Sequence, residues 1–142
     1  MTDELYQQAI LGKARDAVGA GKLDDPDAVA TVNNPVCGDR VTMEVKMSDG
    51  QVAAVAHKVR GCVLCEAAAS VVGANAPGAT RAEIDAARTA LTALLRNGQP
   101  IPEDSWSDLS MFQPVTAHKS RHHCVQLPFE ALTKALDEAD RE

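Results

Sequence analysis

The sequence has 142 residues (15.0 kDa), enough for a single domain spanning residues 1–142 that buries roughly two-thirds of its unfolded surface. The formal net charge of −6 argues against nucleic-acid binding, which needs a basic surface. No apolar run approaches the roughly 20 residues of a membrane span.

The first half of the chain predicts one helix followed by an antiparallel meander. Thr2 caps a helix that begins at Asp3 and ends near Gly19. Residues 40–47 alternate apolar and polar side chains, the period-two pattern of a half-buried strand, and residues 48–50 form a hairpin turn. The three predicted strands are 28–33, 40–47 and 51–59.

The second half predicts helices. A short Ala-rich helix whose first turn holds Cys62 and Cys65 continues over 67–73, and Thr80 with Glu83 forms a capping box that opens a helix ending at Asn97. Pro114 is expected to stop a helical turn that starts at Trp106, and Pro128 marks a kink or the true start of the last helix. The expected fold class is α+β, with a three-stranded antiparallel sheet packed against several helices.

Four cysteines are expected to meet at one sulfur-rich site. Cys62 and Cys65 are three residues apart at the start of a helix, so both sulfurs are expected to face outward from its first turn. The positive end of a helix favours thiolate. The acidic N-terminus lacks a signal-peptide pattern, so we expect a cytoplasmic protein whose thiols serve as ligands or reactive groups rather than disulfides.

Oxygen and nitrogen donors accompany these thiols. Asp39 follows Cys37 across a glycine and is either a metal ligand or an ordinary turn residue. His123 is next to Cys124 and is a candidate ligand or proton relay. His57 and His118 are expected to lie on the surface.

Three blocks of sequence make a resemblance specific. They are Asn34-Pro35-Val36-Cys37-Gly38-Asp39, then Gly61-Cys62-Val63-Leu64 running into Ala67-Ala68-Ala69-Ser70, then Arg121-His122-His123-Cys124-Val125-Gln126-Leu127. In this order they resemble the cysteine blocks of the U-type iron–sulfur cluster assembly scaffolds: IscU, SufU and the N-terminal part of NifU. The long separation between the second and third blocks is similar to the SufU branch.

This resemblance implies a SufE/IscU-like fold and a metal site of Cys37, Asp39, Cys62 and Cys124 that binds Zn²⁺. In the cluster-binding form, Cys37, Cys62 and Cys124 hold a transient [2Fe–2S] cluster. Cys37 and Cys124 are then the candidate sulfur acceptors. The implied partners are a cysteine desulfurase (SufS/IscS-like) and a downstream apo-protein or cluster carrier. Neither a nucleic acid nor a membrane is expected as a partner. Three thiolates and one carboxylate suit tetrahedral zinc and leave one exchangeable oxygen ligand.

The sequence departs from this family at three positions. Cys65 stands where the family usually has serine, Val59 replaces a glycine, and His57 replaces an aromatic residue. Cys65 is therefore an alternative ligand or a resolving thiol. Two other functions stay open: a thiol–disulfide oxidoreductase that uses Cys62 and Cys65, and a metal-stabilised adaptor with no chemistry of its own.

Overall fold

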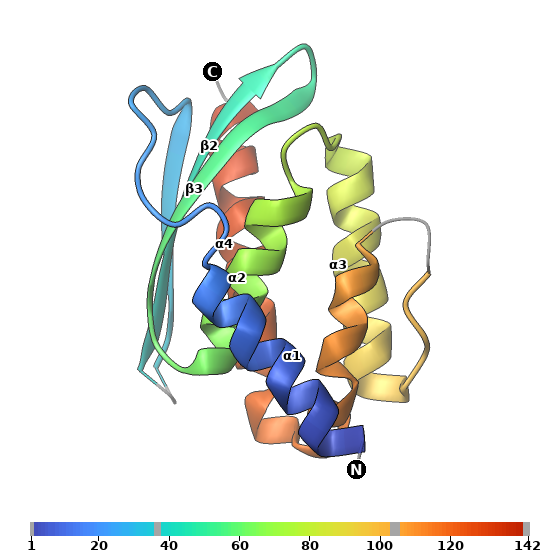
Figure 1. Ribbon diagram of the computed structural model, residues 1–142. Helices are drawn as coiled ribbons and strands as arrows, with labels where there is room; N and C mark the ends of the chain where they lie inside the picture. Colours follow the sequence, from blue (N-terminus) through green and yellow to red (C-terminus); the bar gives the residue numbers. More distant parts are fainter. Residues whose placement is uncertain (1, 36–37, 103–105, 141–142) are drawn as a thin grey trace.

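The computed structural model describes residues 2–35, 38–102 and 106–140, with side chains from residue 8 onward (Figure 1). Along the chain the elements are α1 (Thr2–Asp16), β1 (Ala28–Asn34), β2 (Asp39–Ser48), β3 (Gln51–Arg60), α2 (Val63–Asn75), α3 (Arg81–Asn97), the 3₁₀ helices η1 (Ser107–Ala117) and η2 (Lys119–Arg121), and α4 (His122–Asp140). None of the helices in this part of the chain combines the length and apolarity needed to cross a membrane.

The three strands form an antiparallel sheet in the order β1-β2-β3, which confirms the predicted meander. The alternating apolar residues of β2 fill the inner face: Val41, Met43 and Val45 are fully buried. Asp49 and Gly50 both have positive φ (54° and 78°), as a two-residue hairpin turn requires.

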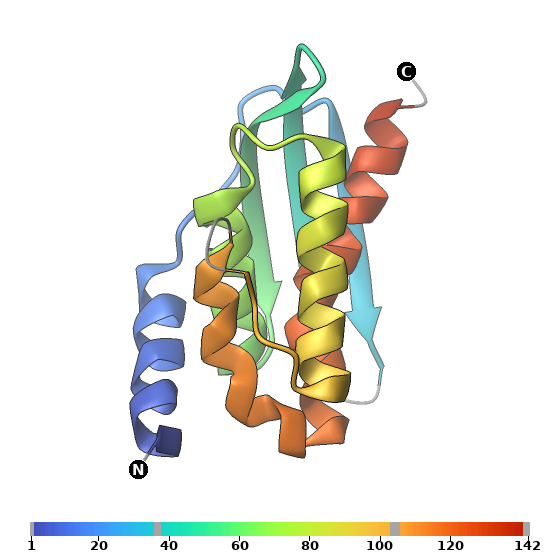
Figure 2. The ribbon, with the colours of Figure 1, turned by 90° about the vertical axis from the view of Figure 1, so that its right-hand side faces the viewer.

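The helices cover one face of this sheet, so the fold class is α+β as expected (Figures 1 and 2). α4 packs on β1 and β2, and α2 packs between β3 and α4. α1 lies against α2, while α3 packs on α4 and η1 at the side away from the sheet (Figure 2). Thr80 and Glu83 form the predicted capping box at the start of α3.

Three expectations about prolines and helix ends are corrected. α2 spans Val63–Asn75 and so ends two residues beyond the predicted Gly73; nine of its residues are buried in the core. Pro114 lies inside η1, which continues to Ala117. Pro128 also lies inside its helix: α4 starts at His122, so this proline does not mark the start.

His57 is buried (4% exposed), so its predicted surface position is wrong. The segment that follows α1 covers this part of β3 through two backbone hydrogen bonds: the His57 N–H donates to the Gly19 carbonyl (2.9 Å) and the Gly21 N–H to the His57 carbonyl (3.0 Å). The ring Nε2 lies 2.7 Å from the Val18 carbonyl oxygen. Since a carbonyl only accepts, Nε2 carries the proton.

Burial lowers the pKa of His57 below its ordinary value of 6.5, and the hydrogen bond to Val18 opposes this only in part. Because the unfolded chain takes up the proton first, the free energy of unfolding is expected to fall as the pH drops below about 6.5. One proton changes this free energy by at most about 1.4 kcal/mol per pH unit. Urea denaturation at pH 7.5 and 5.5 measures the effect.

His57→Gln is expected to reduce the pH dependence, while His118→Gln, which changes an exposed histidine, should retain it. An unchanged pH dependence in His57→Gln would show that the buried ring is not its source.

Candidate metal site

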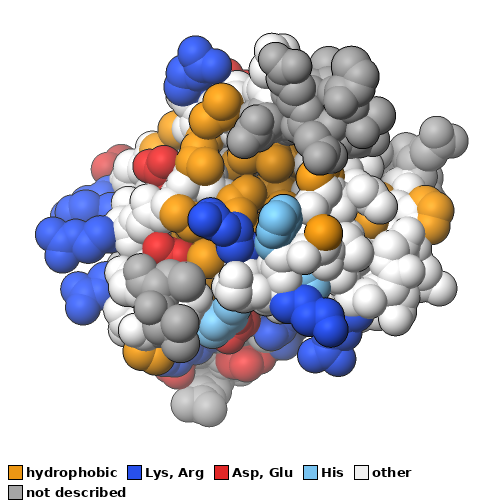
Figure 3. All heavy atoms as spheres, turned by 90° about the horizontal axis from the view of Figure 1, so that it is seen from below, with side chains coloured by type: hydrophobic (Ala, Val, Ile, Leu, Met, Phe, Trp, Pro, Cys, Tyr) orange, Lys and Arg blue, Asp and Glu red, His pale blue; other side chains and the backbone are white. Residues whose placement is uncertain are grey.

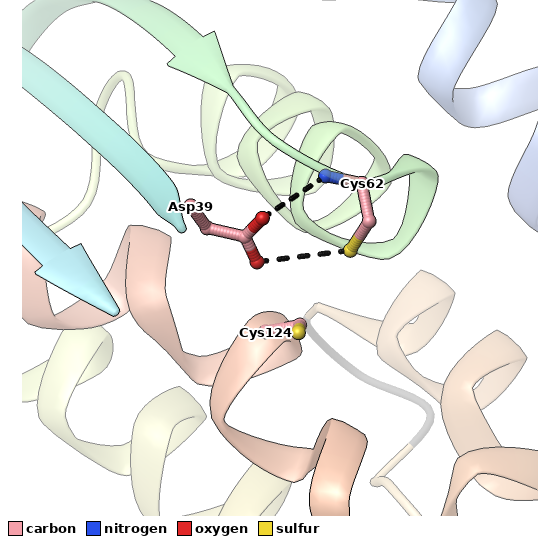
Figure 4. Close-up of side chains that lie close together, drawn as sticks. All are labelled: Asp39, Cys62 and Cys124. Carbon is pink, nitrogen blue, oxygen red and sulfur yellow. Dashed lines mark hydrogen bonds between the residues drawn. The ribbon is translucent and has the colours of Figure 1, made fainter. Parts of the chain in front are cut away.

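Three potential ligands from three distant parts of the sequence meet at one end of the molecule (Figure 4). Asp39 is the first residue of β2, Cys62 directly precedes α2, and Cys124 lies in the first turn of α4. One ligand atom from each lies within 4.8 Å of the other two. Asp39 (3% exposed) and Cys124 (2%) are buried and Cys62 is half-buried. Cys37, the fourth predicted ligand, lies outside the described residues.

Asp39 is held in position by the chain just before α2. Its Oδ1 accepts a hydrogen bond from the Cys62 backbone N–H (3.2 Å), and its Oδ2 lies 3.8 Å from the Cys62 Sγ (Figure 4). This approach requires a glycine at position 61, because a Cβ there would lie 2.8 Å from the Asp39 Cγ. Gly61 is therefore part of the site, although it supplies no ligand.

Cys62 and Cys65 have different environments, which corrects the expectation that both sulfurs face outward. Cys62 is the N-cap residue of α2, with extended backbone angles (φ −77°, ψ 169°), and is not yet part of the helix. Cys65 is fully buried in the hydrophobic core (0% exposed). Burial, and then the charges of Asp39, Cys62 and Glu66, raise the pKa of the Cys65 thiol. It is not among the three residues whose ligand atoms converge.

The histidines beside Cys124 have partners away from the ligand atoms. His123 Nε2 lies 2.6 Å from the Glu130 Oε2 on the outer side of α4. His122 Nε2 lies 3.1 Å from the Val115 carbonyl oxygen. The structure therefore gives no support to His123 as a ligand. His118 is exposed, which confirms its expected position at the surface.

The three side chains fit a metal ion. Tetrahedral zinc, with bonds of about 2.3 Å to sulfur and 2.1 Å to oxygen, separates a sulfur ligand from an oxygen ligand by roughly 3.6 Å. The observed distance between Cys62 Sγ and Asp39 Oδ2 is 3.8 Å. Two thiols and one carboxylate leave a fourth tetrahedral position, for which Cys37 remains the predicted donor.

The ligands line an open hollow of about 450 Å³, and two arginines, Arg60 and Arg121, line it with them. Beside it is an apolar groove of about 500 Å³ between α1, α2 and η1, with Leu11 (44% exposed) and Val63 (36%) among its lining residues. Seen from below, hydrophobic side chains form a patch with basic and histidine side chains beside it (Figure 3).

The sequence placed Gly61 in the second cysteine block without revealing its role, and it did not identify Arg60 as part of this site. Gly61 is required by a contact with Asp39, 22 positions earlier, and nothing local in the sequence reports that contact. For Arg60 there was a usable signal, since it ends the strand that runs directly into Cys62.

Comparisons with known proteins identify the family of this chain. The family model described as "NifU-like N terminal domain" matches residues 5–140. A crystal structure of a nitrogen-fixing NifU-like protein (N-terminal) from Brucella abortus is 38% identical, with a TM-score of 0.92, covering 99% of this chain and 97% of that one.

Two curated relatives extend over nearly the whole chain. The iron-sulfur cluster assembly scaffold protein IscU of Thermotoga maritima is 28% identical over 137 residues, which cover 96% of each protein. The zinc-dependent sulfurtransferase SufU of Bacillus subtilis is 25% identical, over 94% of this chain and 90% of that protein. The chain is thus similar to both kinds of U-type protein.

Proposed function

Because the chain belongs to the NifU-like N-terminal domain family, we propose that it is a scaffold for iron–sulfur cluster assembly that accepts persulfide sulfur from a cysteine desulfurase. The observation that carries the proposal is the convergence of Asp39, Cys62 and Cys124 within 4.8 Å. A scaffold needs such a constellation: thiolates that bind iron or zinc, and a weaker oxygen donor that can be exchanged.

We assign Cys37, Asp39, Cys62 and Cys124 as the ligands of Zn²⁺, and the three cysteines as ligands of a transient [2Fe–2S] cluster. Bound zinc would hold the thiols as thiolates. The chain itself supplies the positioning: the Cys62 N–H orients the Asp39 carboxylate, and Gly61 leaves room for it. Cys37 and Cys124 are the proposed sulfur acceptors, since a thiolate released from the metal becomes a nucleophile.

The apolar groove beside the site supports the proposal that a partner protein binds there. Leu11 and Val63 are large hydrophobic side chains exposed at its lining, where contact with a desulfurase would remove them from water. A downstream apo-protein or cluster carrier would receive the product. We place this chemistry in the cytoplasm, where thiols stay reduced.

The oxidoreductase alternative gains no support from the geometry. A two-cysteine redox motif is expected after a parallel strand in a βαβ unit, whereas Cys62 follows an all-antiparallel sheet. Its sulfur also lies beside Asp39 rather than at an isolated surface position.

The proposal is tested with Cys124→Ser. Loss of this ligand is expected to lower zinc content, measured by elemental analysis, and cluster absorption after anaerobic reconstitution, by at least about tenfold. Stimulation of a cysteine desulfurase should fall with them. The matched control is His123→Gln, which changes the neighbouring side chain that pairs with Glu130 instead. Full metal content and full stimulation in Cys124→Ser would overturn the proposal.

A further inference from the structure

Cys65 is a thiol for which the proposed scaffold chemistry has no use. It is fully buried, and its sulfur is outside the group formed by Asp39, Cys62 and Cys124. It is nevertheless near enough for the charges of Asp39 and Cys62 to act on it. A small apolar residue would fill the same space in the core. Cys65 differs from such a residue in having a sulfur that can react.

The position of Cys65 relative to Cys62 suits a bond between them. Cys62 is the N-cap residue of α2, and Cys65 is the third residue of the helix, N3. The side chain of an N-cap residue characteristically reaches the backbone of N2 or N3. Cys62 makes no such capping hydrogen bond, because its sulfur is directed to Asp39. The proposal requires a rotation about the Cys62 χ1 angle that turns its sulfur from Asp39 towards Cys65 at N3.

We propose that Cys65 is a resolving thiol: it attacks Cys62 when Cys62 carries an accepted sulfur, and releases that sulfur as hydrosulfide. This inference rests on the proposed function, since it requires sulfur to arrive at the site as a persulfide. It goes beyond that function by naming the group that reduces the sulfur. The pair acts on sulfur already bound to this chain and is not a general reductase.

The sulfur first reaches Cys62. The ligand atoms of Cys62 and Cys124 lie within 4.8 Å of one another, so a persulfide on Cys124 is within reach. The Cys62 thiolate attacks the outer sulfur, a bond forms between Cys62 and that sulfur, and Cys124 leaves as a thiolate. No electrons are gained or lost overall in this transfer.

The second step releases the sulfur. The Cys65 sulfur attacks the Cys62 Sγ, and the bond between Sγ and the outer sulfur breaks. The outer sulfur leaves with the bonding electron pair and takes the Cys65 proton, so that it departs as HS⁻. The sulfur gains two electrons, which the two cysteines lose as they form a disulfide. An external dithiol reductant then restores the two thiols for another round.

A single turnover tests the inference without that reductant. The reduced, metal-free protein is loaded anaerobically with inorganic polysulfide and desalted, and hydrosulfide release is then followed. The wild-type protein is expected to release up to about one hydrosulfide per chain. Peptide mapping should then find a disulfide between Cys62 and Cys65. Cys65→Ser is expected to keep the added mass of roughly 32 Da, one sulfur atom, and to release hydrosulfide at least about tenfold more slowly.

The control is Ala68→Ser, which puts the same hydroxyl at another fully buried position of α2 and retains both thiols. It should release hydrosulfide as the wild type does. If wild type and Cys65→Ser both keep the sulfur, and no disulfide joins Cys62 to Cys65, the resolving role is wrong while sulfur acceptance stands. The wild-type mapping gives this answer even if Cys65→Ser fails to fold. If no cysteine of any variant holds the sulfur, both proposals fall.

Discussion

Replacing Gly61 with alanine is expected to weaken metal binding although no ligand is changed. The new Cβ would lie 2.8 Å from the Cγ and 3.0 Å from the Cβ of Asp39, closer than packed carbon atoms tolerate. The carboxylate must move away, which breaks its hydrogen bond with the Cys62 N–H and separates it from both sulfurs. We expect zinc affinity to fall about 10–100-fold, as for the loss of a group that orients a ligand. Competition with a chromophoric chelator measures the change.

Gly12→Ala is the matched control. Gly12 lies in α1, and a Cβ there would meet no atom within 4 Å. This variant should bind zinc with the affinity of the wild type. If Gly61→Ala also bound zinc with wild-type affinity, Asp39 could not be a ligand in the arrangement described here.

The second large effect is expected from Gly73→Ala in α2. Its Cβ would lie 2.6 Å from the carbonyl carbon of Val18 and overlap the attached oxygen. The backbone of Val18 is fixed there, because its N–H donates to the Ser70 Oγ (3.0 Å) and its carbonyl oxygen accepts a hydrogen bond from the His57 Nε2–H (2.7 Å). We expect the free energy of unfolding to fall by about 1–3 kcal/mol, the usual effect of overpacking a close contact. Urea denaturation measures it.

The same control separates packing from helix propensity. Alanine is favoured over glycine inside a helix by up to about 1 kcal/mol, so Gly12→Ala should be neutral or slightly stabilising. Changes of opposite sign in the free energy of unfolding of the two variants would show that the close contact of Gly73 with Val18 determines the effect of Gly73→Ala. A Gly73→Ala protein at least as stable as the wild type would contradict the close contact.

The local elements were predictable from the sequence because their signals are local. The alternation through Val41, Met43 and Val45 fixed which face of β2 is buried, and the Thr80–Glu83 pair fixed the start of α3. The end of α2 was predicted two residues too early, since an Ala-rich helix that is buried nearly all round shows little periodicity.

Tertiary contacts account for the remaining errors. His57 was expected at the surface because nothing in β3 reveals that residues 18–21 return to cover it. Cys65 was expected to share an outward face with Cys62, but an N-cap residue does not follow helical spacing. All four cysteines were expected to meet at one site, and the family resemblance then implied which of them are ligands; Cys62 and Cys124 do meet, whereas Cys65 does not join them.

The three ligands belong to β2, the start of α2 and the start of α4, so an ion bound there would act as a cross-link between the sheet and two helices. The unfolded chain lacks this preformed arrangement of ligands. An ion that binds the folded chain more tightly than the unfolded chain stabilises the folded state by mass action. The midpoint temperature of thermal unfolding would therefore report how much of the site is occupied. It should rise when the metal ion or cluster binds and fall again when it is transferred to a recipient.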